Sequence, residues 1–460
     1  MIVMKFGGSS VADGARIRHV AEIVKTQMNL KPSLVLSAMG DTTDHLLEAG
    51  DLALNKGKVE IAGVEKLHFA AIKTLKLPAQ SEVKILFSEL TRLLSGIALI
   101  RELTPRTKDY LVSFGERLSV RIASAYLKSI KMNAKAFDAF DLGFLTNSNY
   151  GHAELAKESW DLIPEKILPL IKGNVLPVIT GFIAKDEKGC ITTLGRGGSD
   201  LTATMIAAAC KAQEIQVWKD VDGILTADPR IVKNAKPVES VSYEEASELA
   251  YYGAQVLHPR AMLPCMKTGT PVLVKNSYNI EAPGTRIGPP AEVKNTHQAK
   301  SDSGALRAKK RNQPPVRAIT SRRNITLVDI VSTRMLGQYG FLAEVFSTFA
   351  RHSISVDMVA TSEVSVSLTL DAGYDLGEVK KELGKIASID IKTGKAIVSI
   401  IGNVKRSSEI LAKAFRICQL IGVQVQMISQ GASKVNISFI VNDTEAAETV
   451  KALHLDFFAA

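Results

Sequence analysis

A polar, basic and proline-punctuated stretch at residues 289–315 most strongly limits how this 460-residue sequence can fold, because it divides the chain. The stretch has no helical or strand periodicity and contains the densest cationic cluster, made of Arg307, Lys309, Lys310 and Arg311. The rest of the net charge of +10 is spread along the sequence, which favours a solvated linker over a nucleic-acid patch. We therefore expect one long domain before this linker and a separate module after it.

The start of the sequence predicts the fold class of the long domain. Residues 2–6 are a short apolar-rich run, residues 11–27 repeat apolar side chains at helical spacing, and residues 34–36 are apolar again. This order of strand, helix and strand favours a parallel sheet that is covered by helices. A mostly helical pattern at 46–127 and strand-like runs at 175–179, 215–217 and 272–274 complete the pattern.

The module after the linker contains an internal repeat. Residues 354–359 align with 423–428, and residues 362–367 align with 433–438, each pair being about 70 residues apart. This period suits a small α+β unit of about four strands and two helices. We expect two such units in tandem.

Composition bears on the compartment and on the partners of the protein. The sequence is 46% hydrophobic and 23% charged, which is typical of a globular protein with substantial cores. No apolar run approaches the ~20 residues of a membrane-spanning helix, and the start lacks the pattern of a signal peptide. The four cysteines are scattered without the spacing of a zinc site. We expect a cytoplasmic protein that binds neither a membrane nor nucleic acid.

Three glycine-containing segments are candidates for phosphate or carboxylate binding. The first, Lys5-Phe6-Gly7-Gly8, joins a predicted strand to a predicted helix, so that its amides and Lys5 can face an anion. It lacks the residue order of a Walker A motif, and most turns of this kind are merely tight connections. The second segment, residues 192–200, places Arg196 among three glycines at a helix start. A helix capped by Ser199 or Asp200 is its alternative interpretation.

The third segment, residues 217–230, follows a predicted strand and contains several aspartates with Lys219 and Arg230. Such a set of charges can frame a nucleotide, but it is equally typical of a solvated turn. From composition alone, both interpretations stay open.

Taken together, these segments resemble the aspartate kinase branch of the amino acid kinase family over nearly the whole chain. The amino-acid sequences of these segments are most similar to those of the monofunctional, lysine-sensitive, plant-like type. The matching motifs are Lys5-Phe-Gly-Gly, Ser37-Ala-Met-Gly-Asp-Thr-Thr43, Ser113-Phe-Gly-Glu116, Gly181-Phe-Ile183, Gly195-Arg-Gly-Gly-Ser-Asp200, Lys219-Asp-Val-Asp-Gly, Gly253-Ala-Gln-Val-Leu-His-Pro259 and Val274-Lys-Asn-Ser277.

The resemblance implies an α/β fold, with an αβα sandwich on a mainly parallel sheet followed by two α+β ferredoxin-like ACT domains. The kinase domain would cover residues 1–290, with an aspartate lobe at 1–183 and an ATP lobe at 184–290. A linker at 291–315 and ACT domains at 316–392 and 393–460 would follow. The implied reaction converts ATP and L-aspartate to ADP and 4-phospho-L-aspartate, the first step in the biosynthesis of lysine, threonine, methionine and diaminopimelate.

The resemblance also implies site residues. Aspartate would contact Thr43, Glu116, Phe182, Thr193, Arg196, Gly197, Gly198 and Ser199. In that set Arg196 would pair with a carboxylate and Glu116 with the ammonium group. Lys5, Gly7, Gly8 and Asp200 would form the catalytic group. ATP would contact Lys5, Phe6, Gly7, Gly8, Lys219, Asp220, Leu225, Arg230 and Lys275. No side chain is expected to bind a metal directly, since Mg²⁺ would be coordinated by the ATP phosphates.

An effector site is implied in the first repeat. L-Lysine would inhibit the enzyme there, S-adenosylmethionine is a possible second effector, and the site would lie between the subunits of a homodimer or homotetramer. The implied effector residues are Met335, Gln338, Phe341, Leu342, Ser355, Val356, Asp357, Ser362 and Glu363.

Departures from the family pattern and rival functions remain to be weighed. Asp41 stands where many relatives have lysine and adds negative charge near the acidic substrate. Leu225 and Gln255 differ from some relatives in ways that affect the adenine pocket but not the reaction. Lys275 could supply a missing charge or end a strand that faces solvent. The rivals are a kinase acting on glutamate, carbamate or a nucleotide, and a non-catalytic amino-acid sensor. A fusion to homoserine dehydrogenase is not expected, because the chain ends after the second repeat.

Overall fold

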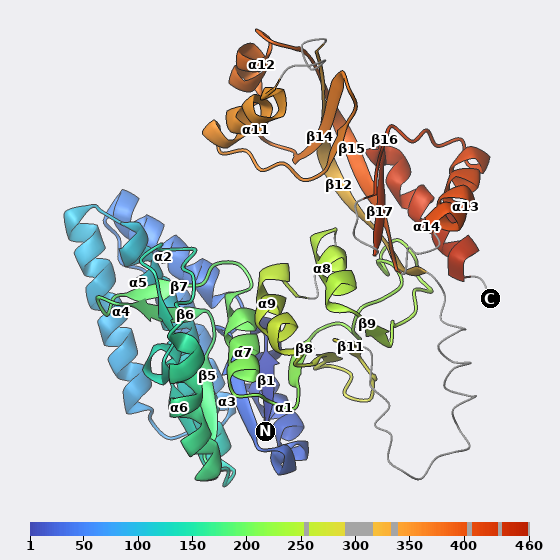
Figure 1. Cartoon of the computed structure of the whole chain (residues 1–460). Helices are drawn as coiled ribbons and strands as arrows, with labels where there is room; N and C mark the ends of the chain where they lie inside the picture. The colour runs from blue at the N-terminus through green and yellow to red at the C-terminus, as the bar shows by residue number, and fades with distance from the viewer. Residues whose placement is uncertain (253–256, 290–315, 333–338, 403–406, 431–434, 459–460) are drawn as a thin grey trace, which may run out of the picture. The chain divides into compact units, whose positions relative to one another are not determined.

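A computed structural model describes residues 1–252, 257–289, 316–332, 339–402, 407–430 and 435–458. The chain forms two compact units (Figure 1). The first unit contains residues 1–224, 239–247 and 256–292, and the second contains residues 225–238, 248–255 and 293–460. The predicted linker at 291–315 and Gln255 lie outside the described residues.

The first unit is built on an eight-stranded sheet in the order β3-β5-β2-β1-β8-β10-β11-β9. Its pairs are parallel except for β10 with β11. Every residue of β1, β2 and β5 is buried, as is typical of a parallel sheet covered on both faces. The predicted parallel sheet is thereby confirmed. The strands are β1 (Ile2–Phe6), β2 (Pro32–Leu36), β3 (Ala134–Phe137), β5 (Leu176–Thr180), β8 (Ile215–Lys219), β9 (Ser240–Val241), β10 (Val272–Asn276) and β11 (Thr285–Ile287).

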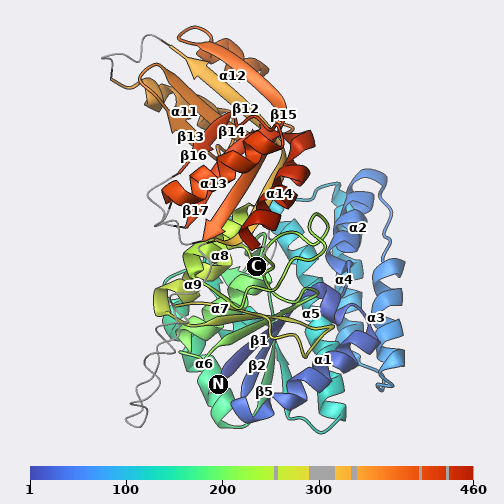
Figure 2. The same ribbon diagram turned by 90° about the vertical axis from the view of Figure 1, so that its right-hand side faces the viewer.

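Helices cover both faces of this sheet, as Figure 2 shows. One layer consists of α1 (Gly14–Thr26), α2 (Thr42–Lys56), α3 (Ala62–Thr74), α4 (Ser81–Ile100) and α5 (Pro105–Ser129). The other layer contains α6 (Ser159–Lys172), α7 (Gly198–Ala209) and α9 (Pro259–Thr268), while α8 (Tyr243–Tyr251) spans the division between the units. A small sheet of β4 (Leu145–Thr146), β6 (Ile183–Asp186) and β7 (Ile191–Thr193) completes the unit.

The long helix α5 is central to the first unit, and its start shows how the sequence specifies it. Pro105 occupies the first turn, where its missing N–H costs no hydrogen bond, and the Thr104 side chain accepts a hydrogen bond from the Thr107 amide at 3.2 Å. The helix packs against α4 and α2 and against the sheet. Its buried side chains belong to the main apolar core, together with β1, β2 and α1.

The second unit contains one antiparallel six-stranded sheet in the order β13-β14-β12-β15-β17-β16. The helices beside it are α11 (Phe341–Arg351), α12 (Gly377–Leu383), α13 (Ser407–Leu420) and α14 (Ala446–Phe458). The strands are β12 (Val316–Val331), β13 (Val359–Thr361), β14 (Ser365–Asp371), β15 (Ser388–Gly402), β16 (Met427–Ser429) and β17 (Asn436–Asn442).

The two repeats share strands instead of following one another strictly in tandem. Strands β12 and β15 are 16 and 15 residues long and pair along their length, so each passes through both repeats. Val316 and Ile319 of β12 pack in the core of the second repeat, whereas Val328 and Ile330 pack in the core of the first. Sequence similarity alone does not reveal this sharing, because it depends on the length of the paired strands.

Candidate functional site

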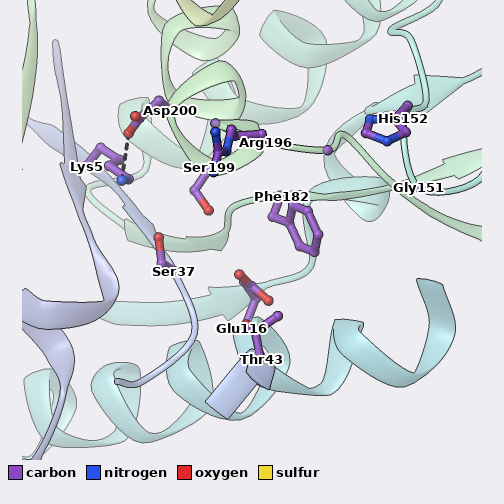
Figure 3. Close-up of a pocket in the computed structure, with 13 residues that line it drawn as sticks. Lys5, Ser37, Thr43, Glu116, Gly151, His152, Phe182, Arg196, Ser199 and Asp200 are labelled. Atoms are coloured by element: carbon purple, nitrogen blue, oxygen red, sulfur yellow. Dashed lines mark ion pairs between the residues drawn. The ribbon is translucent and has the colours of Figure 1, made fainter. Parts of the chain in front are cut away.

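A cavity of about 480 Å³ lies at the carboxyl ends of strands β1, β2 and β5 in the first unit (Figure 3). Ligands in open parallel sheets bind at this edge, where loops bring side chains together. The cavity is lined by Lys5, Ser37, Thr43, Glu116, Gly151, His152, Phe182, Gly195, Arg196, Gly197, Gly198, Ser199 and Asp200. The structure thus gathers most of the predicted catalytic and aspartate-binding residues in one place.

Lys5, Asp200 and Lys219 form a buried charged cluster at this cavity. The Lys5 ammonium lies 2.6 Å from Asp200 Oδ1, and the Lys219 ammonium lies 3.6 Å from Asp200 Oδ2. Burial opposes ionisation of Asp200, but the two lysines outweigh it, so the pKa of Asp200 lies below its usual value. Two cations against one carboxylate leave a net positive charge, which suits an anionic ligand.

Glu116 is a buried carboxyl group with one oxygen still available. Its Oε1 accepts a hydrogen bond from the Ala38 amide at 3.2 Å, and its buried Oε2 has no hydrogen-bond partner among the described residues. Burial raises the pKa of Glu116 to about 8, although the Ala38 amide and Lys5 oppose this effect. An ammonium group at Oε2 would provide the missing partner and favour the ionised carboxylate.

The loop before α7 presents Arg196 to the cavity from another side. Arg196 is exposed, and within the described ranges its guanidinium has no ion-pair partner. Gly197 has φ +74°, and a Cβ there would lie 2.6 Å from the Cβ of His258. Only glycine therefore allows this loop to turn tightly against His258 and begin α7. In Figure 3, Arg196 and Ser199 lie apart from Glu116 and Thr43, with Phe182 between them.

The residues expected to bind ATP are divided between the first and the second unit, unlike those expected to bind aspartate. Phe6 lies in β1 and stacks on Trp218, and Gly7 and Gly8 follow directly. Lys275 is the next-to-last residue of β10. Its ammonium lies 5.1 Å from the Trp218 ring centroid and forms no ion pair among the described residues. Asp220 directly follows β8. Leu225 and Arg230 belong to the second unit, and Arg230 is an exposed side chain paired with Asp228 at 2.7 Å.

Sequence reasoning missed several residues of this site. Ser37 and Gly195 stand inside quoted motifs but were assigned no role, whereas no sequence signal identifies His152. Thr193, expected at the substrate, does not line the cavity and instead donates hydrogen bonds to buried Asp109. Asp109 lies seven residues before Glu116 on the same helix face, a spacing that could have singled it out.

The described effector residues surround the start of α11 and the β13 hairpin. Phe341 and Leu342 begin α11, while Ser362 and Glu363 form the exposed turn between β13 and β14. Ser355, Val356 and Asp357 precede β13, and Met335 and Gln338 lie outside the described residues.

Asp357 already has partners within the second unit. Its side chain is 5% exposed, its Oδ2 lies 3.1 Å from Arg322, and its Oδ1 accepts a hydrogen bond from the Tyr251 hydroxyl. Burial raises the pKa of Asp357, and the bonds from Tyr251 and Arg322 oppose this effect. A ligand ammonium at Asp357 would therefore compete with these two side chains.

Comparison with known proteins places this arrangement in a family. The amino acid kinase family matches residues 1–276, and an ACT domain matches residues 328–375 and 398–457. The chain is 48% identical to aspartokinase 1, chloroplastic, of Arabidopsis thaliana, an alignment that covers 99% of this chain and 80% of the relative.

Two solved structures of E. coli aspartokinase III are also similar. The R-state complex with aspartate and ADP has a TM-score of 0.81 at 33% identity, covering 100% of both chains. The T-state complex with lysine and aspartate has a TM-score of 0.79 at 34% identity, covering 100% of this chain and 99% of that one.

The chain belongs to the amino acid kinase family, and within that family to the aspartokinases that carry regulatory ACT domains. It is accordingly an aspartate kinase. Among the described helices, none is both long and apolar enough to cross a membrane.

Proposed function

We propose that the chain transfers the γ-phosphoryl group of ATP to the side-chain carboxylate of L-aspartate through the residues of this cavity. The observation that carries the proposal is the cavity itself. It combines a net positive lysine cluster with a guanidinium and a buried carboxyl oxygen that have no partner among the residues that the structure describes. These groups complement the phosphates, a carboxylate and the ammonium group of the two substrates.

Substrate orientation follows from Arg196 and Glu116. Arg196 offers a planar fork that can hold a carboxylate through two hydrogen bonds. The free oxygen of Glu116 receives the ammonium group, and Thr43 and Ser199 line the space between them. This polarity directs the remaining carboxylate of aspartate toward Lys5.

The reaction needs charge control more than proton transfer. The attacking carboxylate is already ionised near neutral pH, so no general base is required. Its oxygen forms a bond to the γ-phosphorus while the bond to the bridging oxygen of ADP breaks, and negative charge builds on the phosphoryl oxygens. Lys5 and the amides of Gly7 and Gly8 stabilise that charge, and Asp200 holds Lys5 and Lys219 in position.

We propose that magnesium enters this site bound to the nucleotide. In the described part of the chain, no group of three or more His, Cys, Asp or Glu side chains could hold a metal ion. Bound Mg²⁺ would neutralise phosphate charge, and Asp200 is a buried carboxylate that lines the same cavity. The cytoplasm stays our expected compartment, although the Arabidopsis relative is described as chloroplastic.

An assay of acyl-phosphate formation tests this proposal. Purified protein is supplied with ATP, Mg²⁺ and single amino acids, ADP release is coupled to a reporter, and hydroxylamine traps the product as a hydroxamate. We expect ADP and hydroxamate in equal amounts with L-aspartate. ADP release without hydroxamate, or equal rates with several unrelated amino acids, would contradict the assignment.

We also propose that L-lysine binds the first repeat and inhibits the enzyme. One difference between the repeats supports this assignment: Asp357 aligns with Gln426 of the second repeat. Their backbone amides make matching bonds, from Asp357 to Thr369 and from Gln426 to Ile440, both at 2.9 Å. Only the first repeat therefore offers a carboxylate to an ammonium group at this position. A homodimer or homotetramer remains the expected assembly, and S-adenosylmethionine a possible second effector.

The matched variants Asp357→Ala and Gln426→Ala test the lysine site. Asp357→Ala should raise the lysine concentration for half-inhibition at least about tenfold, within the usual range of allosteric coupling. Gln426→Ala should leave it unchanged. Equal inhibition of both variants would place the effector elsewhere, and a wild type insensitive to lysine would leave the repeats with an assembly role.

A further inference from the structure

Asp109 is a buried carboxylate on the same face of α5 as Glu116. The two side chains are seven residues apart, nearly two helical turns, and each residue is 3% exposed. Glu116 lines the cavity and Asp109 does not. Any influence of Asp109 on the substrate must therefore pass through the residues it binds.

Three hydrogen bonds define what Asp109 holds. Its Oδ2 accepts bonds from the amides of Gly151 at 2.9 Å and Thr193 at 2.8 Å. Its Oδ1 accepts a bond from the Thr193 hydroxyl at 2.8 Å. Within the described ranges no lysine or arginine forms an ion pair with Asp109, so these three donors fix its position. Burial raises the pKa of Asp109, and the bonds from Gly151 and Thr193 oppose that effect.

The two bound segments form adjoining walls of the cavity. Gly151 and His152 line it directly, and Thr193 ends β7 three residues before Arg196. The walls touch at Gly195, where φ is +71° and a Cβ would lie 2.8 Å from Nδ1 of His152. The Ala153 amide also donates to the Thr193 carbonyl at 2.9 Å. Both walls are thus fastened to each other and, through Asp109, to α5.

This fastening links the two groups that hold opposite ends of the substrate in our proposed function. Glu116 is carried by α5, whereas Arg196 is carried by the loop that follows Thr193. The bond between Asp109 and Thr193 fixes α5 relative to that loop, and with it the separation of Glu116 and Arg196. That separation decides how long an acidic amino acid the cavity accepts.

We propose that Asp109 is a positioning residue that sets the length of the substrate cavity and selects a four-carbon over a five-carbon acidic amino acid. The inference rests on the proposed function, because it uses Glu116 and Arg196 as the two substrate anchors. Glutamate is longer than aspartate by one methylene group. With the hydrogen bonds to Asp109 in place, the cavity excludes this methylene group. Without them, the cavity walls can move apart and accommodate it.

The test compares Asp109→Ala with Asp109→Asn. Alanine removes all three hydrogen bonds to Asp109 and leaves two backbone amides unpaired. Asparagine keeps the shape: its oxygen can accept from both amides, and its NH₂ can donate to the Thr193 hydroxyl. For each protein, kcat/KM is measured with aspartate and with glutamate, and glutamate is measured as a competitive inhibitor where its turnover is undetectable.

We expect Asp109→Ala to raise KM for aspartate about tenfold, to change kcat and KM for ATP about twofold at most, and to lower the aspartate-to-glutamate preference about tenfold. Asp109→Asn should restore most of the preference. A purely structural role predicts a lower melting temperature and parallel losses for both substrates with the preference unchanged, and that result would overturn the inference.

Thr193→Val and Thr193→Ser provide a second pair in case Asp109→Ala folds poorly. Valine removes only the hydroxyl bond to Asp109, while serine retains it. We expect valine to lower the preference and serine to keep it; equal preferences in both would also overturn the inference. If the wild type forms no aspartyl phosphate, the proposed function fails instead, so the two failures are distinguishable.

Discussion

Two regions of this chain are proposed to hold an amino acid, and each offers a buried carboxyl group to its ammonium end. In the catalytic cavity, Glu116 has one oxygen that finds no hydrogen-bond partner in the described part of the chain. In the first repeat, Asp357 is bonded to Tyr251 and paired with Arg322 at 3.1 Å. Burial raises the pKa of both groups, but only Asp357 has an arginine and a tyrosine opposing it.

This difference suits the two tasks. A catalytic site gains rate when its groups are positioned in advance, so that substrate meets an acceptor already in place. A regulatory site must distinguish two states of the protein, because an effector shifts an equilibrium only through a difference in affinity. An ammonium group that displaces Tyr251 and Arg322 from Asp357 supplies such a difference.

The largest expected effect separates catalysis from regulation. Lys5→Ala should lower kcat about 10²–10³-fold, because one lost donor to the developing phosphoryl charge typically has that effect. KM for both substrates should change little, and lysine inhibition of the residual activity should persist. Steady-state kinetics check this result, with the exposed Lys25→Ala as control. A normal kcat at saturating ATP would reduce Lys5 to a binding residue.

Arg196→Lys tests the substrate anchor in the same cavity. Lysine keeps the charge but loses the planar fork. The variant should therefore lose about 2–3 kcal/mol of transition-state stabilisation, measured as a lower kcat/KM for aspartate. KM for ATP should stay nearly constant. Titration of each substrate at saturating levels of the other measures both values. Unchanged aspartate kinetics would remove Arg196 from the site.

The pH dependence of kcat/KM tests Glu116. Because its pKa is about 8 before substrate binds, the carboxyl is neutral below that pH and loses its attraction for the ammonium group. The value for aspartate should therefore fall about tenfold per pH unit below pH 8. Glu116→Gln should flatten the profile at a low value.

The pH dependence of protein stability provides an independent test of the raised pKa of Glu116. The folded protein binds this proton more tightly than the unfolded chain, whose Glu116 has a pKa near 4.5. Stability contributed by the protonated group is therefore lost as the pH rises between these values. The melting temperature of the wild type should therefore fall over that pH range relative to that of Glu116→Gln. Identical pH profiles of the two melting temperatures would contradict the raised pKa.

The two regions were not equally predictable from sequence. The parallel sheet and the glycine loops follow from local patterns, since apolar runs and helix starts lie within a few residues of each other. Asp109 was not predicted because its partners Gly151 and Thr193 are remote in sequence, and its spacing of seven residues from Glu116 does not by itself reveal them. The pair Tyr251 and Asp357 likewise spans 106 residues. Contacts of this kind depend on the folded unit, and a single sequence does not encode them visibly.

The smallest expected effect concerns the partners of Asp357. Tyr251→Phe keeps the ring and removes only the hydroxyl that bonds Asp357. Lysine then has one hydrogen bond fewer to displace, and because such a bond contributes about 1 kcal/mol, its half-inhibition concentration should fall about fivefold. Basal kcat should remain unchanged. Inhibition curves for wild type, Tyr251→Phe and the exposed control Tyr374→Phe measure the effect. Weaker inhibition in Tyr251→Phe would show that Tyr251 supports the lysine-bound state, and the two carboxyl groups would then differ less than we infer.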